Sequence, residues 1–352
     1  MKIEIKGRSN VRSIFVSACL WVMIGALHTP SVMAGETLTR VRSNGKVRCG
    51  VTERLLGFSY QDKSGRWQGF NVDFCRAIAS AVFGNPDKVS FIPLSAPNRF
   101  PVLLSRKIDI LAHTATWTFG REAGIGVQFP AIYFYDGQTF MVPAKKKLKK
   151  LEDLKGATIC VEKGTTFQLN MADVFQVKKI PYTPMVFDSF EEVGKAFLAG
   201  KCEACTAERS VLSALRAEAP GNAKGFTIMR REISKEPLGP VVRRGDDEWI
   251  TLVRWVLFAL IEAEERGITS KNVRQIQKTT TDTEILRFLN TSGSLGKSLG
   301  LKSDWVARVI EQVGNYEEIF ERNLGAGSVL KIERGMNRLW NKGGLLYAPS
   351  FQ

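Results

Sequence analysis

A group of hydroxyl side chains followed by an arginine offers the clearest chemistry in this sequence. Thr114, Thr116 and Arg121 lie in the segment IDILAHTATWTFGR, whose apolar beginning at Ile108 predicts a buried strand. Hydroxyl groups can bind a small ligand, and a guanidinium group can hold a carboxylate with two parallel N–H donors. The same residues would also suit an ordinary strand-to-helix loop, with threonines as caps and the arginine in a surface ion pair.

Two later features could supply the other side of a binding site. Residues 164–166 read Gly-Thr-Thr before an expected helix, which is typical of an anion-binding helix N-terminus and equally of an ordinary N-cap. Glu208 follows an expected strand that ends at Ala207. A carboxylate there would face the same crevice as the other strand ends.

The cysteines indicate disulfides and no metal site. Five cysteines lie beyond residue 34, namely Cys49, Cys75, Cys160, Cys202 and Cys205. Cys202 and Cys205 form a CxxC pair, but the pattern around them is that of a strand, and no second close pair exists for a zinc site. We take Cys49–Cys75 and Cys160–Cys202 as the working pairing with Cys205 free, although spacing alone leaves other pairings open.

The N-terminus has the pattern of a secretory signal peptide. Four basic residues precede an apolar run from Ile14 to Leu27, and small residues precede an expected cleavage after Ala34. We therefore expect an exported, periplasmic protein. The formal net charge of +15 can indicate nucleic-acid binding, but an export signal and scattered basic residues argue against that partner.

Alternating strand and helix patterns surround the candidate residues. A first series runs from a strand at 46–51 through helices at 71–83 and 99–105, and a second, shorter series begins near residue 150. An apolar helix at 249–265 should form part of the first core. Helical patterns follow at 283–289, 305–314, 316–323 and 330–342, and they predict a helical extension.

Several segments together resemble the solute-binding proteins of family 3, which serve polar amino-acid ABC importers, and in particular their general L-amino-acid-binding branch. The segments are GFNVDFCRAIASAVFG, KIDILAHTATWTFGRE, VEKGTTFQLN, ISKEPLGPVVRRGDDEW and ERNLGAGSVLKIERGMNRLWNKGGLLYAP. The resemblance covers essentially everything after Gly35.

The resemblance implies an α/β fold, a type II periplasmic-binding-protein clamp with a ligand cleft between two lobes and a C-terminal helical extension. We expect a signal peptide at 1–34, lobe 1 at 35–139 and again at 239–270, lobe 2 at 140–238, and the extension at 271–352.

The resemblance also implies roles for particular residues. Thr114, Thr116 and Arg121 would hold the α-carboxylate of an amino acid, with Thr166 from the second lobe. Glu208 would pair with the α-ammonium. Because the two charges of a zwitterion would be met by different lobes, ligand binding should favour the closed clamp.

Some positions depart from the family pattern. Glu208 stands where the family usually has aspartate, and Thr52 stands where many relatives have an acidic or amide side chain. Asn71 replaces an acidic residue, and an aromatic residue is missing near Leu55 and near Ala96. Phe58 remains a candidate apolar wall. These changes predict a broad or shifted ligand range.

The function expected from these observations is a monomeric, non-catalytic receptor that binds L-amino acids and delivers them to inner-membrane ABC permease subunits, without a cofactor. One alternative is a sensor or adhesin that has lost transport. Another is a dehydratase of cyclic carboxylates, similar to cyclohexadienyl dehydratase, with Glu208 as its general acid. No Walker-type phosphate loop or paired-histidine motif supports a nucleotide or metal enzyme.

Overall fold

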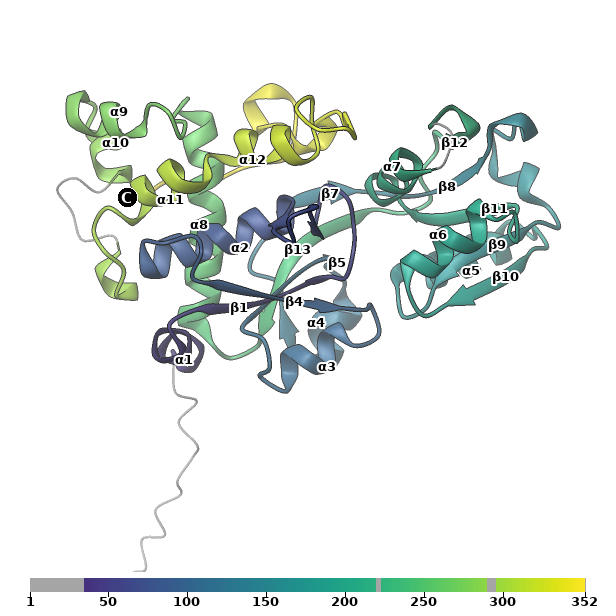
Figure 1. Cartoon of the computed structure of the whole chain (residues 1–352), viewed down its shortest axis with the longest axis horizontal. Helices are drawn as coiled ribbons and strands as arrows, with labels where there is room; N and C mark the ends of the chain where they lie inside the picture. The colour runs from purple at the N-terminus through teal and green to yellow at the C-terminus, as the bar shows by residue number, and fades with distance from the viewer. Residues whose placement is uncertain (1–34, 220–222, 290–295, 352) are drawn as a thin grey trace, which may run out of the picture. The chain divides into compact units, whose positions relative to one another are not determined.

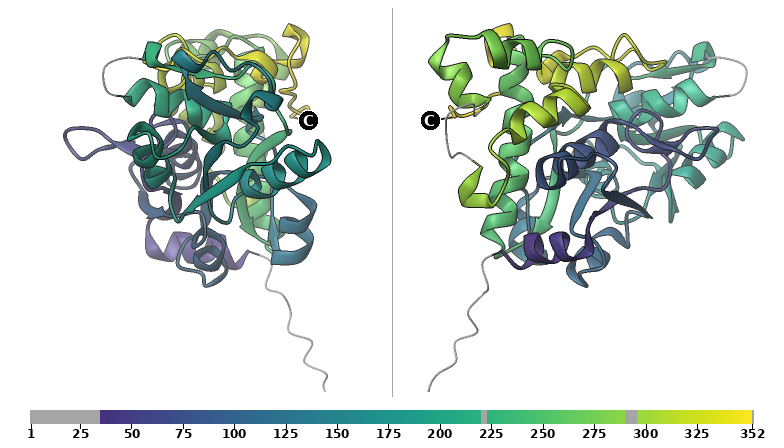
Figure 2. Two further views of the ribbon diagram at one scale, coloured as in Figure 1. Left: turned by 90° about the vertical axis from the view of Figure 1, so that its right-hand side faces the viewer. Right: turned by 60° about the vertical axis from the view of Figure 1, so that its left-hand side comes forward.

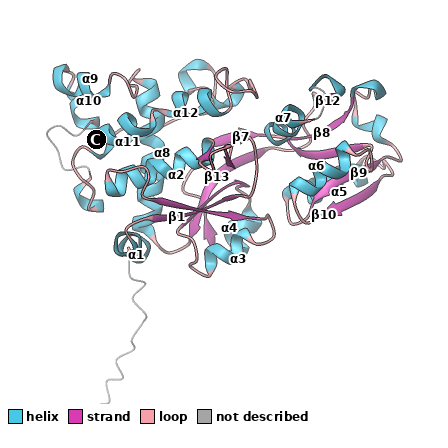
Figure 3. Ribbon diagram, viewed as in Figure 1, coloured by secondary structure: helices cyan, strands magenta, loops and turns pink. Residues whose placement is uncertain are grey.

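The computed structural model describes residues 35–219, 223–289 and 296–351. Its strands form two separate mixed sheets and one two-stranded hairpin, and Figure 3 shows helices beside both sheets. Both sheets belong to a single unit of the chain, residues 33–352. The expected signal peptide and its cleavage after Ala34 lie outside the described residues.

The first sheet consists of β1 (Val47–Thr52), β4 (Val89–Leu94), β5 (Ile110–Thr116), β6 (Val127–Gln128), β7 (Phe134–Asp136) and β13 (Glu236–Arg243). Its order is β4-β1-β5-β13-β6, and β7 also pairs with β13. β4, β1 and β5 are parallel, whereas β13 runs antiparallel to β5. The carboxyl ends of β1 and β5 therefore meet at one edge of the sheet, where Thr52 and Thr116 end their strands.

The helices of this part are α1 (Glu36–Asn44), α2 (Phe70–Phe83), α3 (Arg99–Leu104), α4 (Phe119–Ile125) and α8 (Asp247–Glu265). The expected core helix near the end of the first series is confirmed by α8, which is buried along most of its length. Asp246 begins it by accepting a hydrogen bond from the backbone N–H of Trp249 at 3.2 Å. A small antiparallel hairpin is formed by β2 (Tyr60–Gln61) and β3 (Trp67–Gln68).

The second sheet consists of β8 (Gln138–Pro143), β9 (Thr158–Glu162), β10 (Thr183–Phe187), β11 (Ala204–Glu208) and β12 (Phe226–Ile228), in the order β10-β9-β11-β8-β12. β10, β9 and β11 are parallel, so that Glu162 and Glu208 end two neighbouring strands at the same edge. Its helices are α5 (Thr166–Val177), α6 (Phe190–Leu198) and α7 (Arg209–Glu218).

The C-terminal extension contains α9 (Val273–Thr279), α10 (Thr283–Phe288), α11 (Trp305–Val313) and α12 (Tyr316–Asn323). Helix α11 packs on α2, and α12 packs on α2 and α8 (Figures 1 and 2). The helix expected at 330–342 was wrong. That segment contains only short 3₁₀ turns, because Lys331 and Gly335 both have a φ of 48°, which an α-helix does not allow.

Two disulfides tie the sheets to neighbouring segments. The expected pairings Cys49–Cys75 and Cys160–Cys202 are both confirmed, and Cys205 is a buried free thiol. The first bond joins β1 to α2, and the second joins β9 to the turn before β11. Each bond therefore secures a strand whose end lies close to the candidate site.

Among the helices of the described ranges, none is long and apolar enough to cross a membrane. Within the same ranges, no three His, Cys, Asp or Glu side chains are grouped so that they could hold a metal ion.

Candidate ligand site

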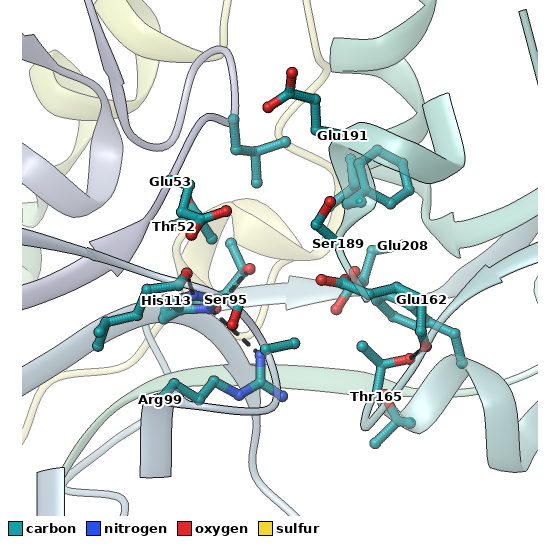
Figure 4. Close-up of a pocket in the computed structure, with 18 of the residues that line it drawn as sticks. Thr52, Glu53, Ser95, Arg99, His113, Glu162, Thr165, Ser189, Glu191 and Glu208 are labelled. Atoms are coloured by element: carbon teal, nitrogen blue, oxygen red, sulfur yellow. Dashed lines mark hydrogen bonds between the residues drawn. The ribbon is translucent and has the colours of Figure 1, made fainter. Parts of the chain in front are cut away.

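A pocket collects residues from the strand ends of both sheets. Its empty space is about 640 Å³, a figure that includes the open solvent at its mouth. Six of the seven ligand-binding residues expected from the sequence line it, namely Thr52, Thr114, Thr116, Arg121, Thr166 and Glu208. In Figure 4, Thr52, Glu53, Ser95, Arg99 and His113 lie on one side, and Glu162, Thr165, Ser189 and Glu208 lie on the other.

Arg121 is held in the pocket wall without a carboxylate partner. It stands in the first turn of α4, which Thr118 caps by accepting the backbone N–H of Arg121 at 3.2 Å. The side chain turns back and donates to the carbonyl oxygen of Thr116 at 2.7 Å. Only 9% of the residue is exposed, and the ion pairs of the described residues do not include it. Burial lowers the pKa of Arg121 to about 9.

The hydroxyl groups at the end of β5 lie beside this guanidinium. Thr114 has a φ of 47°, a left-handed conformation that is strained for a β-branched residue. Its hydroxyl donates to the carbonyl oxygen of His113 at 2.7 Å. Strain of this kind is concentrated at ligand sites, where the surrounding structure enforces it. Thr52, at the end of the neighbouring β1, hydrogen-bonds the hydroxyl of Ser59.

Thr166 brings the second sheet to the same place. It is the first residue of α5, and its hydroxyl lies 3.5 Å from that of Thr116. Both hydroxyls donate to one carboxylate oxygen of Glu236, Thr116 at 2.5 Å and Thr166 at 3.0 Å. Glu236 belongs to β13 and is 1% exposed. Its carboxylate therefore joins hydroxyl groups positioned by β5 and by α5.

The Gly-Thr-Thr turn is not an ordinary side-chain cap. Thr165 occupies the N-cap position of α5, but its hydroxyl donates to the carbonyl oxygen of Glu162 at 2.7 Å. The Thr165 side chain makes no cap hydrogen bond to the first backbone N–H groups of this helix. Those groups are left for another acceptor, as the anion-binding interpretation of the turn requires.

Glu208 supplies a buried carboxyl group on the second side. It ends β11, precedes α7 and is 2% exposed. Burial raises the pKa of Glu208 well above its ordinary value, and the nearby carboxylates of Glu236 and Asp136 raise it further. A positively charged group placed beside Glu208 would reverse this effect and favour the ionised carboxylate.

Phe58 has a different position from the one expected. It is 1% exposed and packs edge-to-face against Phe70 and Phe134, with ring centroids 6.3 and 5.5 Å apart, and it does not line the pocket. Its aromatic ring is used in the core that supports α2. Trp117, the other aromatic residue near the site, stacks on Phe129 outside the pocket lining.

Of the positions that depart from the family pattern, some line the pocket and one lies outside it. Leu55 and Ala96 do line the pocket, so that its wall there is aliphatic. Asn71 lies outside the pocket in the interior, where its side-chain oxygen accepts the hydroxyl of Tyr133 at 2.9 Å.

The pocket also contains charged residues that the sequence interpretation did not assign to ligand binding. Arg99, Glu53, Glu162 and Glu191 line it, and so does His113. The sequence did not indicate a binding role for Arg99, because a basic residue at the start of a short helix is usually a surface residue. Only the folded arrangement shows that Arg99 is 4% exposed.

The arrangement suits a small zwitterion. Arg121, with hydroxyl groups beside it, can hold a carboxylate, and Glu208 on the opposite side can hold an ammonium group. Both charges lack an ion-pair partner in the described part of the chain, where the recorded ion pairs include neither residue. A bound zwitterion would satisfy both at once.

Comparison with known proteins agrees with this geometry. The family model described as bacterial extracellular solute-binding proteins, family 3, matches residues 47–272. The general L-amino acid-binding periplasmic protein AapJ of Rhizobium johnstonii is 49% identical over 91% of this chain and 94% of its own length. The glutamate/glutamine/aspartate/asparagine-binding protein BztA of Rhodobacter capsulatus is 42% identical over 93% of this chain and 98% of its own.

A solved structure is similar over nearly the whole chain. The ABC transporter periplasmic binding protein from Brucella ovis with glutathione bound superposes with a TM-score of 0.87 at 46% identity, and the match covers 90% of this chain and 99% of the other. The relatives named here are binding proteins, and none of their names describes an enzyme. The chain belongs to the bacterial extracellular solute-binding proteins of family 3.

Proposed function

We propose that the protein is the periplasmic substrate-binding component of an amino-acid ABC importer. It captures L-amino acids in the pocket and delivers them to permease subunits in the membrane. The observation that carries this proposal is the placement of Arg121 and Glu208 in the lining of one pocket. Both are buried, and neither forms an ion pair with another described residue. Arg121 comes from α4 and Glu208 from the end of β11. Their charges match the two ends of an α-amino acid.

The other residues take their roles from their places in the pocket. Arg121 binds the α-carboxylate. The hydroxyls of Thr114, Thr116 and Thr166 donate to His113 and Glu236 in this structure, so each turns its O–H toward the α-carboxylate when the ligand enters. Glu208 binds the α-ammonium. Because these groups come from two lobes, which we place at 35–139 with 239–270 and at 140–238, the bound ligand stabilises the closed arrangement.

The relatives support the wider setting of this proposal. AapJ is named as a general L-amino acid-binding periplasmic protein, and BztA is named for two acidic amino acids and their amides. We infer that this chain works in the periplasm as a monomer, beside an inner-membrane permease and without a cofactor. The glutathione bound to the Brucella ovis relative adds γ-glutamyl peptides to the ligands to be tested.

The test is a thermal-shift panel on the purified protein, followed by calorimetry of every ligand that responds. The panel contains the twenty L-amino acids, several D-amino acids, glutathione, and the cyclic carboxylates arogenate and prephenate. A ligand that binds the native state raises the melting temperature by mass action, so that micromolar binders respond. We expect shifts from several L-amino acids and smaller or no shifts from their D-enantiomers.

The other outcomes have distinct meanings. A response to the cyclic carboxylates alone, with turnover of either, would replace the receptor by a dehydratase that uses Glu208. No response from any L-amino acid would contradict the proposed transport role and favour a sensor or adhesin.

A further inference from the structure

Arg99 is a second buried cation of the pocket, and nothing in the proposed recognition of the α-amino acid uses it. It begins α3 and is 4% exposed. One guanidinium nitrogen, Nη1, lies 3.4 Å from Nδ1 of His113. Its Nε is buried and has no hydrogen-bond partner. The ion pairs recorded for the described residues do not include Arg99.

His113 does not compensate this charge. Its Nε2 lies 2.6 Å from the carbonyl oxygen of Leu94, which can only accept, so that Nε2 carries the proton. Burial, and then the positive charge of Arg99, lower the pKa of His113 to about 3. The neutral ring therefore accepts from Arg99 through Nδ1. His113 holds the guanidinium in place and leaves its positive charge available to a ligand.

Arg99 and Arg121 are neighbours in the wall of the pocket. Both guanidinium groups lie over the ring of Phe100, at 5.1 and 5.5 Å from its centroid. Two cations held this close repel each other, and the positive charge of Arg99 lowers the pKa of Arg121 in addition to burial. The carboxylates of Glu236 and Glu208 act on Arg121 in the opposite direction, as Glu162 and Glu208 do on Arg99. The pocket therefore presents two positive groups on the side formed by the first sheet, and neither forms an ion pair within 4 Å among the described residues.

The opposite side carries two carboxyl groups in a matching arrangement. Glu162 ends β9 and Glu208 ends β11, and these strands are parallel neighbours in the second sheet. Figure 4 shows both side chains across the pocket from Arg99. Burial raises the pKa of Glu162 to about 7, and Arg99 acts in the opposite direction. Glu162 is not among the recorded ion pairs of the described residues either.

From this arrangement we propose that the pocket is built for amino acids that carry a second carboxylate. Arg99 binds that carboxylate, and Glu162 accepts an N–H beside it when the ligand has one, as in a second amino-acid end. The inference rests on the proposed function, because Arg121 and Glu208 hold the first amino-acid group. A ligand with only one carboxylate leaves Arg99 buried and unpaired, which is unfavourable.

Two matched ligand pairs test the proposal by calorimetry. L-Glutamate and L-glutamine have the same shape and differ in the second carboxylate. 2,6-Diaminopimelate and L-lysine both carry two amino groups and again differ in one carboxylate. For the wild-type protein at pH 7.5 we expect the dicarboxylate of each pair to bind at least about tenfold more tightly, since one buried charge-assisted contact is worth that factor.

Variants assign the effect to residues. Arg99→Met should reduce both ratios to within about threefold, with L-glutamine affinity serving as a check that the pocket is intact. Arg106→Met is the matched control, because Arg106 is an exposed arginine of the same lobe that pairs with Glu36 outside the pocket, and it should leave both ratios unchanged. Glu162→Gln should weaken diaminopimelate more than glutamate.

The results test the role of Arg99, the role of Glu162 and the proposed function separately. Equal binding of glutamate and glutamine by the wild type, or ratios that survive Arg99→Met, would overturn the role of Arg99. Equal losses for the two dicarboxylates in Glu162→Gln would overturn the role of Glu162. If the wild type bound no L-amino acid at all, the proposed function itself would fail, which is a different outcome from loss of selectivity.

Discussion

Replacing Arg121 should weaken ligand binding and at the same time stabilise the ligand-free protein. Arg121→Met removes the proposed two-pronged contact with the α-carboxylate while keeping a long, flexible side chain. Loss of a buried charge-assisted contact costs roughly 2–5 kcal/mol, so affinity for the best L-amino acid should fall at least about 30-fold.

The stability effect has the opposite sign. Burial lowers the pKa of Arg121 to about 9, well below its ordinary value, which corresponds to an upper limit of about 5 kcal/mol against the charged form at pH 7. The penalty applies because the folded pKa lies below the unfolded one and both lie above pH 7. The bond to the Thr116 carbonyl and the contact with Phe100 offset much of it. A net gain of about 1–2 kcal/mol remains for the variant.

Thermal and urea unfolding of the ligand-free protein measure this gain, and calorimetry measures the affinity. For a chain of this size a gain of 1 kcal/mol raises the melting temperature by about 2–4 °C. Arg121→Lys is the companion variant, since it keeps the charge but not the fork of donors, and it should lose affinity without gaining stability. A less stable Arg121→Met protein that still binds within threefold of wild type would refute the reasoning.

Two further predictions concern the buried groups around the site. Burial raises the pKa of Asp136 to about 7, so that its ionisation opposes folding. Asp136→Asn should therefore be more stable than wild type by on the order of 2–4 kcal/mol in urea at pH 8. The difference should shrink as the pH falls below 7 and vanish below about pH 3, where the wild-type carboxyl is protonated in both the folded and the unfolded state. A difference independent of pH would contradict this. Removing the bond between Cys160 and Cys202 with two alanines should cost about 4 kcal/mol in denaturant unfolding, given their sequence separation of 42 residues. A loss below about 1 kcal/mol would show that the second lobe does not depend on that constraint.

Much of the site could be predicted because its residues occupy strand ends. Thr114, Thr116 and Glu208 each close an apolar run, and the carboxyl ends of parallel strands meet where ligands bind. Arg121 was found through its position five residues after Thr116. The disulfide pairings could be predicted because each bond joins two cysteines of the same expected lobe, and both bonds are present in the structure.

The sequence by itself determined the α/β alternation, the strand ends that carry the proposed site for the α-amino acid, and membership of a family of solute-binding proteins. Only the tertiary structure decided which charges stay uncompensated. Phe58 lies in the core. Glu236, from a strand distant in the sequence, accepts the hydroxyls of Thr116 and Thr166. Arg99 is a buried cation with a neutral histidine beside it. The physical reason is that burial and pairing depend on segments far apart in the chain. The charge of a side chain can be known from one position, but whether that charge is satisfied depends on all its neighbours.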